Sequence, residues 1–105
     1  MPIVPTYWIH QERIAKAVAE AERELLPDVV HIRYSFGEDW SGSNAIFFRV
    51  LLSDQASTRA GLREVARRVS DTVLDRVQPD ELGLQAYFNF RAASEQAQLN
   101  EEAWA

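Results

Sequence analysis

Residues 45–52, AIFFRVLL, form a strongly apolar stretch that decides how the rest of the chain is arranged. Its side chains alternate between two sides, which is typical of a β-strand. One side carries Ile46, Phe48, Val50 and Leu52. The other side carries Phe47, Arg49 and Leu51. The stretch therefore predicts a strand that sends its first set of side chains into a core.

The segment before this stretch has the same period of two. The residues expected to face inward are Val30, Ile32, Tyr34 and Phe36, and those expected to face outward are His31, Arg33 and Ser35. Between the two segments, residues 37–44 read GEDWSGSN and supply two glycines and small polar residues for a chain reversal. Together the two segments predict a β-hairpin.

A third strand is predicted at residues 84–91, LQAYFNFR, where apolar and polar residues alternate again. Its inward set is Leu84, Ala86, Phe88 and Phe90, and its outward set is Gln85, Tyr87, Asn89 and Arg91. The sequence contains no internal repeat, long linker or low-complexity block.

Two helices are predicted around these strands, each with one apolar stripe. The first runs from a cap at Thr6 to about Leu26, before Pro27, with the stripe Tyr7, Ile14, Val18, Ala21 and Leu25. The second covers about residues 58–77, capped by Asp54 or Ser57 and ended by Pro79, with the stripe Leu62, Val65, Val69, Val73 and Val77. A single stripe on each helix favours packing side by side on one face of a sheet.

The predicted fold class is α+β, in the order α-β-β-α-β, with a three-stranded sheet and two helices packed on one face. A chain of 105 residues accommodates one such domain. We divide it into an extended arm at residues 1–6, the domain at residues 7–91, and a polar C-terminal tail at residues 92–105, in which a short helix near Ser94 is possible.

Composition points to a cytoplasmic protein without a membrane segment. The chain has no cysteine, which excludes disulfides and thiolate metal sites. It begins without a signal-like apolar run and has no stretch long enough to span a bilayer. A net charge of −5 disfavours general attraction to nucleic acid but leaves room for a local basic patch.

The outward sets of the three strands form an uncovered sheet face that mixes arginine with aromatic residues. One interpretation is a protein-partner or homodimer surface, in which Phe47, Leu51 and Tyr87 contact the partner. A second is structural pairing across the strands without any ligand. A third is an anion or nucleic-acid face made by His31, Arg33, Arg49, Asn89 and Arg91. We favour the protein partner.

Two tryptophans extend this hypothesis. Trp40 lies in the acidic turn, where it either folds back on the sheet or the tail, or anchors a partner. Trp104 and Leu99 lie in a tail too polar to form its own core, so they dock either on this domain, as we favour, or on another protein. Glu38 and Asp39 fall short of the ligand number of a calcium site, and we predict no metal site.

The sequence gives little support for catalysis, and we predict a non-enzymatic protein without a cofactor. It has no P-loop, no GxSxG and no HExxH, and only His10 and His31 titrate near neutral pH. Phosphodiester cleavage built on His31 and neighbouring arginines would require a second acid or base that the sequence does not identify.

Several short motifs carry a resemblance. With GEDWSG at residues 37–42, AIFFRVLLSD at 45–54, YFNFR at 87–91, and SEQA and EEAWA in the tail, the chain resembles small uncharacterised bacterial proteins. The resemblance implies a two-gene toxin–antitoxin or defence pair whose other member is a helical HEPN-type protein. This chain would then be the antitoxin-like component, and no catalytic residue is implied.

Overall fold

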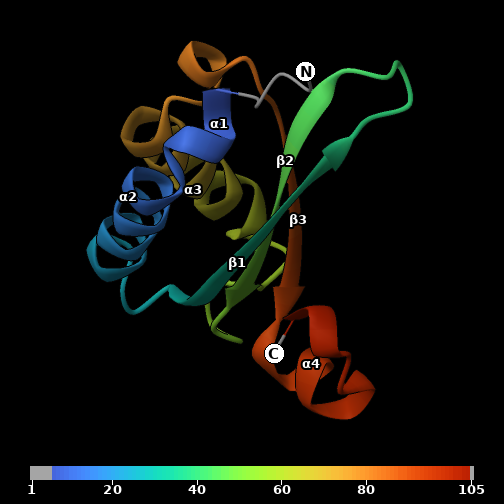
Figure 1. Ribbon diagram of the computed structural model, residues 1–105. Helices are drawn as coiled ribbons and strands as arrows, with labels where there is room; N and C mark the ends of the chain where they lie inside the picture. Colours follow the sequence, from blue (N-terminus) through green and yellow to red (C-terminus); the bar gives the residue numbers. More distant parts are fainter. Residues whose placement is uncertain (1–5, 105) are drawn as a thin grey trace.

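A computed structural model describes residues 6–104, with side chains from Trp8 onward, and confirms the predicted α+β fold (Figure 1). The α-helices are α1 (Thr6–Ile9), α2 (Gln11–Glu24), α3 (Leu62–Val77) and α4 (Ala93–Leu99). The strands are β1 (Val29–Glu38), β2 (Asn44–Leu52) and β3 (Gln85–Ala92). Two 3-10 turns are η1 (Pro79–Leu82) and η2 (Glu102–Trp104). The arm predicted at residues 1–6 lies outside the described residues except for Thr6, which begins α1.

The sheet has the order β1-β2-β3, with the strongly apolar strand β2 at its centre. Strand β1 pairs with β2 antiparallel, as a hairpin must, whereas β3 pairs with β2 in parallel. A parallel neighbour requires a crossover connection, and α3 supplies it. The register sets Phe47 opposite Tyr87, and Arg49 between Arg33 and Asn89.

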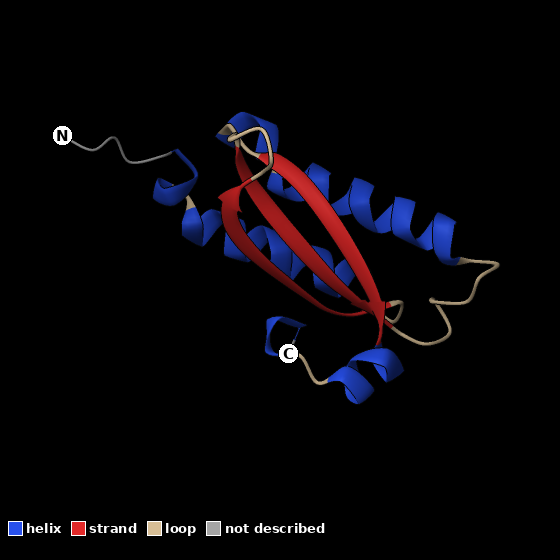
Figure 2. Ribbon diagram, turned by 90° about the vertical axis from the view of Figure 1, so that its right-hand side faces the viewer, coloured by secondary structure: helices blue, strands red, loops and turns tan. Residues whose placement is uncertain are grey.

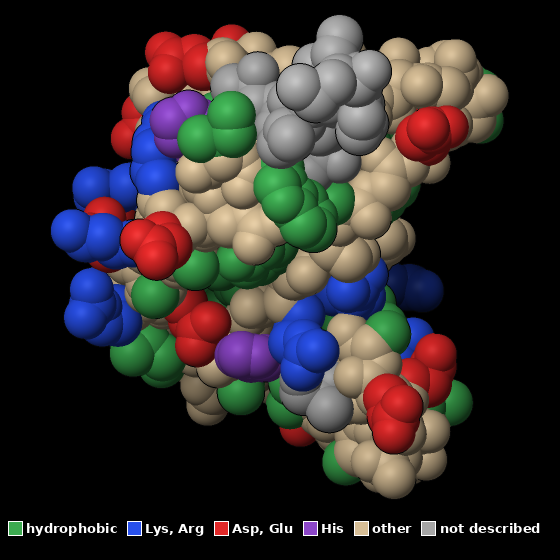
Figure 3. All heavy atoms as spheres, in the orientation of Figure 1, with side chains coloured by type: hydrophobic (Ala, Val, Ile, Leu, Met, Phe, Trp, Pro, Cys, Tyr) green, Lys and Arg blue, Asp and Glu red, His purple; other side chains and the backbone are tan. Residues whose placement is uncertain are grey.

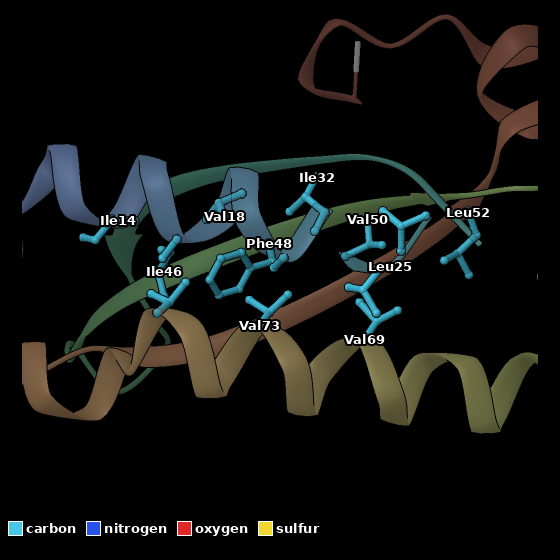
Figure 4. Packing of buried hydrophobic residues seen from close by; sticks show 14 of the residues in the cluster. Ile14, Val18, Leu25, Ile32, Ile46, Phe48, Val50, Leu52, Val69 and Val73 are labelled. Atoms are coloured by element: carbon cyan, nitrogen blue, oxygen red, sulfur yellow. The ribbon is translucent and has the colours of Figure 1, made fainter. Parts of the chain in front are cut away.

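Helices α2 and α3 lie on the same side of the sheet, and the core fills the space between them and the strands (Figures 2 and 4). All four predicted inward side chains of β2 are buried, with exposures of 1% or less. The ring of Phe48 stacks on Phe88 with centroids 4.9 Å apart. The buried residues contributed by the two helices are Ile14, Ala17, Val18, Ala21, Val69, Val73 and Val77. Burial of each large side chain is worth about 1.5–3 kcal/mol.

The predicted first helix is two helices, which corrects the expectation of one continuous helix to Leu26. His10 leaves helical geometry, with φ −106° and ψ 25°, and its carbonyl accepts the first hydrogen bond of α2 from the Ile14 amide at 3.0 Å. At the other end α2 stops at Glu24, and the last turn tightens before Pro27, which has no amide hydrogen to continue the ladder. The side chain of Tyr7 lies outside those described.

Strand β1 begins with an irregularity that reverses one predicted orientation. Val29 is fully buried, whereas Val30, predicted to face inward, is 47% exposed. The pairing register with β2 shifts between Val29 and His31, so one extra residue is accommodated and the alternation restarts. From Ile32 onward the predicted inward set holds, with Ile32 itself 3% exposed.

The second helix also starts later than predicted, at Leu62 rather than near residue 58. Residues 53–61 form hydrogen-bonded turns that bury Ala56, and Gly61 takes the N-cap position without a side-chain bond. Neither Asp54 nor Ser57 caps α3. Asp54 instead accepts a hydrogen bond from the Ser94 amide at 3.0 Å, at the first turn of α4. The end of α3 before Pro79 is as predicted.

The tail folds back on the domain. Helix α4 begins at Ala93, beside the predicted Ser94, and continues the chain directly from β3. Trp104 is docked and only 9% exposed, as favoured from the sequence, but Leu99 is 51% exposed and is not docked.

On the α2 side of the molecule, acidic and basic side chains are interspersed (Figure 3).

Candidate partner-binding face

The sheet face opposite α2 and α3, here called the open face, carries the candidate functional residues. Strand alternation brings the outward side chains of all three strands onto it. Those residues are Arg33, Ser35, Phe47, Arg49, Leu51, Tyr87, Asn89 and Arg91, whereas His31, near the start of β1, turns to the sheet edge. The face divides into an aromatic end near the β1–β2 turn and an arginine end where the C-terminal segment docks (Figure 1).

The aromatic end consists of Trp40, Phe47 and Tyr87. The rings of Phe47 and Tyr87 are stacked, with centroids 5.4 Å apart and an interplanar angle of 19°. Trp40 meets Tyr87 edge-on at 5.7 Å and 64°. The other face of the indole remains in solvent, because Trp40 is 87% exposed. Trp40 therefore folds back on the sheet only through one edge contact with Tyr87, and most of its ring is available to a partner.

Gly37 lies beside this cluster on the neighbouring strand. A β-carbon placed there would lie 3.4 Å from the Phe47 ring. That distance is at the limit of ordinary van der Waals contact, so a methyl group at residue 37 would touch the ring.

Asp39 fixes the turn that presents Trp40. One carboxylate oxygen accepts hydrogen bonds from the Ser41 amide at 2.9 Å, the Ser41 hydroxyl at 2.6 Å and the Ser43 amide at 3.0 Å. The other oxygen accepts the Tyr87 hydroxyl at 2.7 Å. An acidic side chain that satisfies the following amides is a common turn device. Here the Asp39 carboxylate also connects the turn to Tyr87 of β3, so the turn that carries Trp40 is held in place by hydrogen bonds.

These bonds shift two pKa values in opposite directions. Hydrogen bonds from Ser41 and Tyr87 lower the pKa of Asp39 from 3.8 to about 2, because they favour the ionised carboxylate. The same bond raises the pKa of the Tyr87 phenol, and partial burial and the nearby negative charge act in the same direction. At neutral pH the aromatic end therefore holds a carboxylate bonded to a neutral phenol.

The arginine end consists of Arg49 and Arg91, and both contact the C-terminal segment, residues 93–104. Arg49 donates from Nε to the carbonyl of Ala103 at 2.8 Å and from Nη1 to the Ser35 hydroxyl at 3.1 Å. Arg91 donates to Gln96 Oε1 at 2.8 Å. The two guanidinium groups thus bind acceptors of their own chain.

Trp104 completes the arginine end. The Arg91 guanidinium carbon lies 4.3 Å from the centroid of the indole, within the range of a cation–π contact. Its Nη2 is 3.0 Å from Glu101 Oε1, and the Arg91 side chain is 15% exposed. In Figure 3, Lys and Arg side chains gather where the C-terminal segment meets the rest of the molecule.

The other predicted residues lie near this surface without joining either end. Arg33 and Asn89 are exposed on β1 and β3, and Leu51 is half-buried on β2, opposite Arg91. His31 faces the edge of the sheet, where its Nδ1 lies 3.3 Å from Glu22 Oε2. The same oxygen accepts the Ile32 amide at 3.2 Å, so Glu22 covers an edge amide of β1.

Sequence reasoning did not assign roles to Gln96 and Glu101, nor the anchoring role to Asp39. The sequence signal for Asp39 was the small polar run after it, Ser41 to Ser43, which supplies the amides and hydroxyls that it accepts. The contacts of Gln96 and Glu101 depend on how the tail crosses the sheet, and no spacing in the sequence encodes that crossing.

The described residues contain neither a metal-binding cluster nor a membrane-spanning helix. No group of three or more histidine or acidic side chains is placed to hold a metal ion among residues 6–104. Within the same part of the chain, none of the helices combines the length and the apolar character that crossing a membrane requires.

The fold and the face define an α+β domain with one helical layer, one exposed sheet face and a docked C-terminal segment. No family model matches the chain, and no curated protein matches it. Solved structures of the MamM CTD are similar in fold. A cysteine-to-serine variant aligns with TM-score 0.50 and 16% identity over 79% of this chain and 96% of that chain.

Two further variants of the same domain agree. A methionine-to-leucine variant gives TM-score 0.50 and 16% identity over 79% of this chain and 98% of the other. A variant that exchanges a histidine and a glutamate gives 0.51 and 17%, over 79% and 93%. The similarity establishes the fold, and a shared fold does not by itself define a function.

Proposed function

We propose that this domain is a non-enzymatic module that binds a protein partner through the aromatic end of its open face. The observation that carries the proposal is the presentation of Trp40. An indole that is 87% exposed leaves a large apolar area in water, at a cost that a partner removes. Tryptophan and tyrosine are enriched among the residues that dominate binding energy at interfaces.

The contacts that hold Trp40 in place support the same proposal. A side chain that must be ordered on binding costs free energy, and a side chain that is already held costs less. Trp40 contacts Tyr87 edge-on, and Tyr87 stacks on Phe47. Asp39 accepts a hydrogen bond from Tyr87, which connects the turn to β3. The aromatic end is therefore pre-organised for contact.

The chemistry of this end favours a partner with a basic residue beside an apolar one. Ionised Asp39 and the exposed Glu38 directly precede Trp40 in the turn, and a cation over an aromatic face near a carboxylate is attracted by both. The toxin–antitoxin arrangement, with a helical HEPN-type partner, remains a prediction from the resemblance of the motifs. A homodimer through the same face is the other form of this proposal.

Nucleic-acid binding through the arginines is the alternative. It has weaker support than a protein partner because Arg49 and Arg91 already bind the C-terminal segment. Phosphate contacts by these two residues would require that segment to move.

The test is affinity capture from native cells with the wild-type chain, Trp40→Ala and Trp8→Ala. Trp8 is 58% exposed on α1, outside the three strands, so its removal is a matched control. We expect one stoichiometric protein, retained by Trp8→Ala and lost at least tenfold in Trp40→Ala. Light scattering on the purified chain tests the homodimer with the same variants. Equal capture by all three chains, with monomers throughout, would overturn the proposal.

A further inference from the structure

The C-terminal segment lies on the arginine end in the manner of a bound peptide. Glu101 offers a carboxylate to Arg91 at 3.0 Å, Ala103 offers its carbonyl to Arg49 at 2.8 Å, and Trp104 places its ring under the Arg91 guanidinium. A carboxylate, a main-chain carbonyl and an aromatic ring within four residues satisfy two arginines of different strands. This is the chemistry by which arginine clusters recognise acidic segments.

The receptor side of this contact belongs to the rigid sheet. Arg49 and Arg91 project from β2 and β3, neighbouring strands whose register is continuous from Ala45 to Leu52. Arg91 is 15% exposed, so it is partly desolvated, and its acceptors Gln96 and Glu101 both belong to the C-terminal segment. Without that segment, Arg91 would keep its position but lose Gln96, Glu101 and Trp104. A partly buried guanidinium that has lost its acceptors favours the binding of another segment that supplies the same acceptors.

The segment itself is held by little apolar burial. Trp104 is its buried hydrophobic anchor, whereas Leu99 is 51% exposed and residues 97–103 are exposed throughout. Segments with few buried apolar contacts open locally at a lower free energy than the whole domain unfolds. The C-terminal segment therefore belongs to the part of the molecule that can open while the sheet remains intact.

We propose that the arginine end is a recognition site for an acidic, aromatic segment of a partner protein, and that the C-terminal segment fills it in the free state. The partner segment would carry a carboxylate about three residues before an aromatic ring, as Glu101 precedes Trp104. A tethered occupant competes at an effective concentration of about millimolar, so the partner must exceed the affinity of the tail. This site uses residues distinct from the aromatic end, and it stands or falls independently of the function proposed above.

The probe is an acetylated peptide with the sequence of residues 98–105, QLNEEAWA, titrated into the isotope-labelled full-length chain. Two-dimensional NMR of backbone amides and arginine Nε–H groups detects binding up to millimolar dissociation constants. We expect the Trp104→Ala chain to bind the peptide at least tenfold more tightly than the wild-type chain does. The shifted signals should come from β2, β3 and the side chains of Arg49 and Arg91.

Two comparisons keep the result specific. A peptide with alanine at the positions of Glu101 and Trp104 should bind at least tenfold more weakly, and so should a Trp104→Ala chain that also carries Arg91→Leu. Trp8→Ala, which removes an exposed indole from α1, should behave as wild type. Should Trp104→Ala fail to fold, Glu101→Ala removes the exposed carboxylate alone and should bind the peptide several-fold more tightly than wild type.

Three results would overturn the inference. The peptide binds the wild-type and released chains equally, so the tail does not compete. The folded Trp104→Ala chain shows no shifts at millimolar peptide. A single-stranded oligonucleotide binds the released chain with a steep dependence on salt while the peptide does not, which assigns the arginines to nucleic acid.

Discussion

The guanidinium group of Arg91 lies over the ring of Trp104, 4.3 Å from its centroid, and connects β3 to the end of the described chain. The same group reaches Gln96 and Glu101. One side chain of the sheet therefore contacts both structured parts of the C-terminal segment, α4 and η2. Arg91 thereby supplies an ion pair, a hydrogen bond and a cation–π contact to that segment.

Replacement of Arg91 should loosen the tail and leave the core intact. Arg91→Met keeps most of the aliphatic stem but removes the ion pair, the hydrogen bond and the cation–π contact. Because Glu101 is 53% exposed, we expect a modest loss, about 1–2 kcal/mol. Hydrogen exchange by mass spectrometry should show faster exchange confined to residues 93–104. Arg63→Met, at an exposed position of α3, is the control, and faster exchange in β2 would contradict the prediction.

Acid should weaken the contribution of Asp39 to stability. Its folded-state pKa of about 2 lies below the ordinary 3.8, so the ionised carboxylate favours the folded state. That contribution is complete well above pH 4 and is lost as the pH falls through about 2. Denaturant unfolding of wild type and Asp39→Asn should differ most at pH 5 and converge toward pH 2. A difference that grows on acidification would contradict the sign.

The periodicity of the strands predicted most of the face correctly. The alternation in β2 and β3 was sufficient to separate Phe48 and Phe88 from Phe47 and Tyr87, because side chains of a strand must point to opposite faces. The stripe of each long helix likewise selected its buried side, except that Leu62, predicted in the stripe of α3, is the first residue of that helix and is 37% exposed. These are local patterns, and each is read from a few neighbouring residues.

Features set by distant contacts were beyond the sequence. The N-cap role assigned to Asp54 was wrong because its carboxylate bonds to Ser94, forty residues later in the chain. The tail was expected to dock, but the pairing of Glu101 with Arg91 depends on a path across the sheet that no spacing specifies. The bulge between Val29 and His31 turns Val30 outward, and its position depends on the pairing of β1 with β2, which the local sequence does not specify.

Two adjacent phenylalanines of β2 should differ sharply in their effect on stability. Phe48 is fully buried and stacks on Phe88, so Phe48→Ala should cost about 3–5 kcal/mol. Phe47 lies on the open face and is only partly buried, so Phe47→Ala should cost about 1 kcal/mol, including its stacking on Tyr87. Urea unfolding with circular dichroism measures both. Equal losses would mean that the open face is covered in solution.

The bulge at the start of β1 makes a prediction opposite to simple alternation. Continuous alternation places Val30 in the core, whereas the register shift buries Val29 completely and leaves Val30 47% exposed. Val29→Ala should therefore destabilise the fold by about 2 kcal/mol, the order expected for loss of a buried branched side chain. Val30→Ala should change the free energy of unfolding by less than about 0.5 kcal/mol. The two single variants, unfolded in urea under one set of conditions, form a matched pair. A larger loss in Val30→Ala would place the bulge elsewhere, and with it the outward orientation of His31 and the edge contact with Glu22.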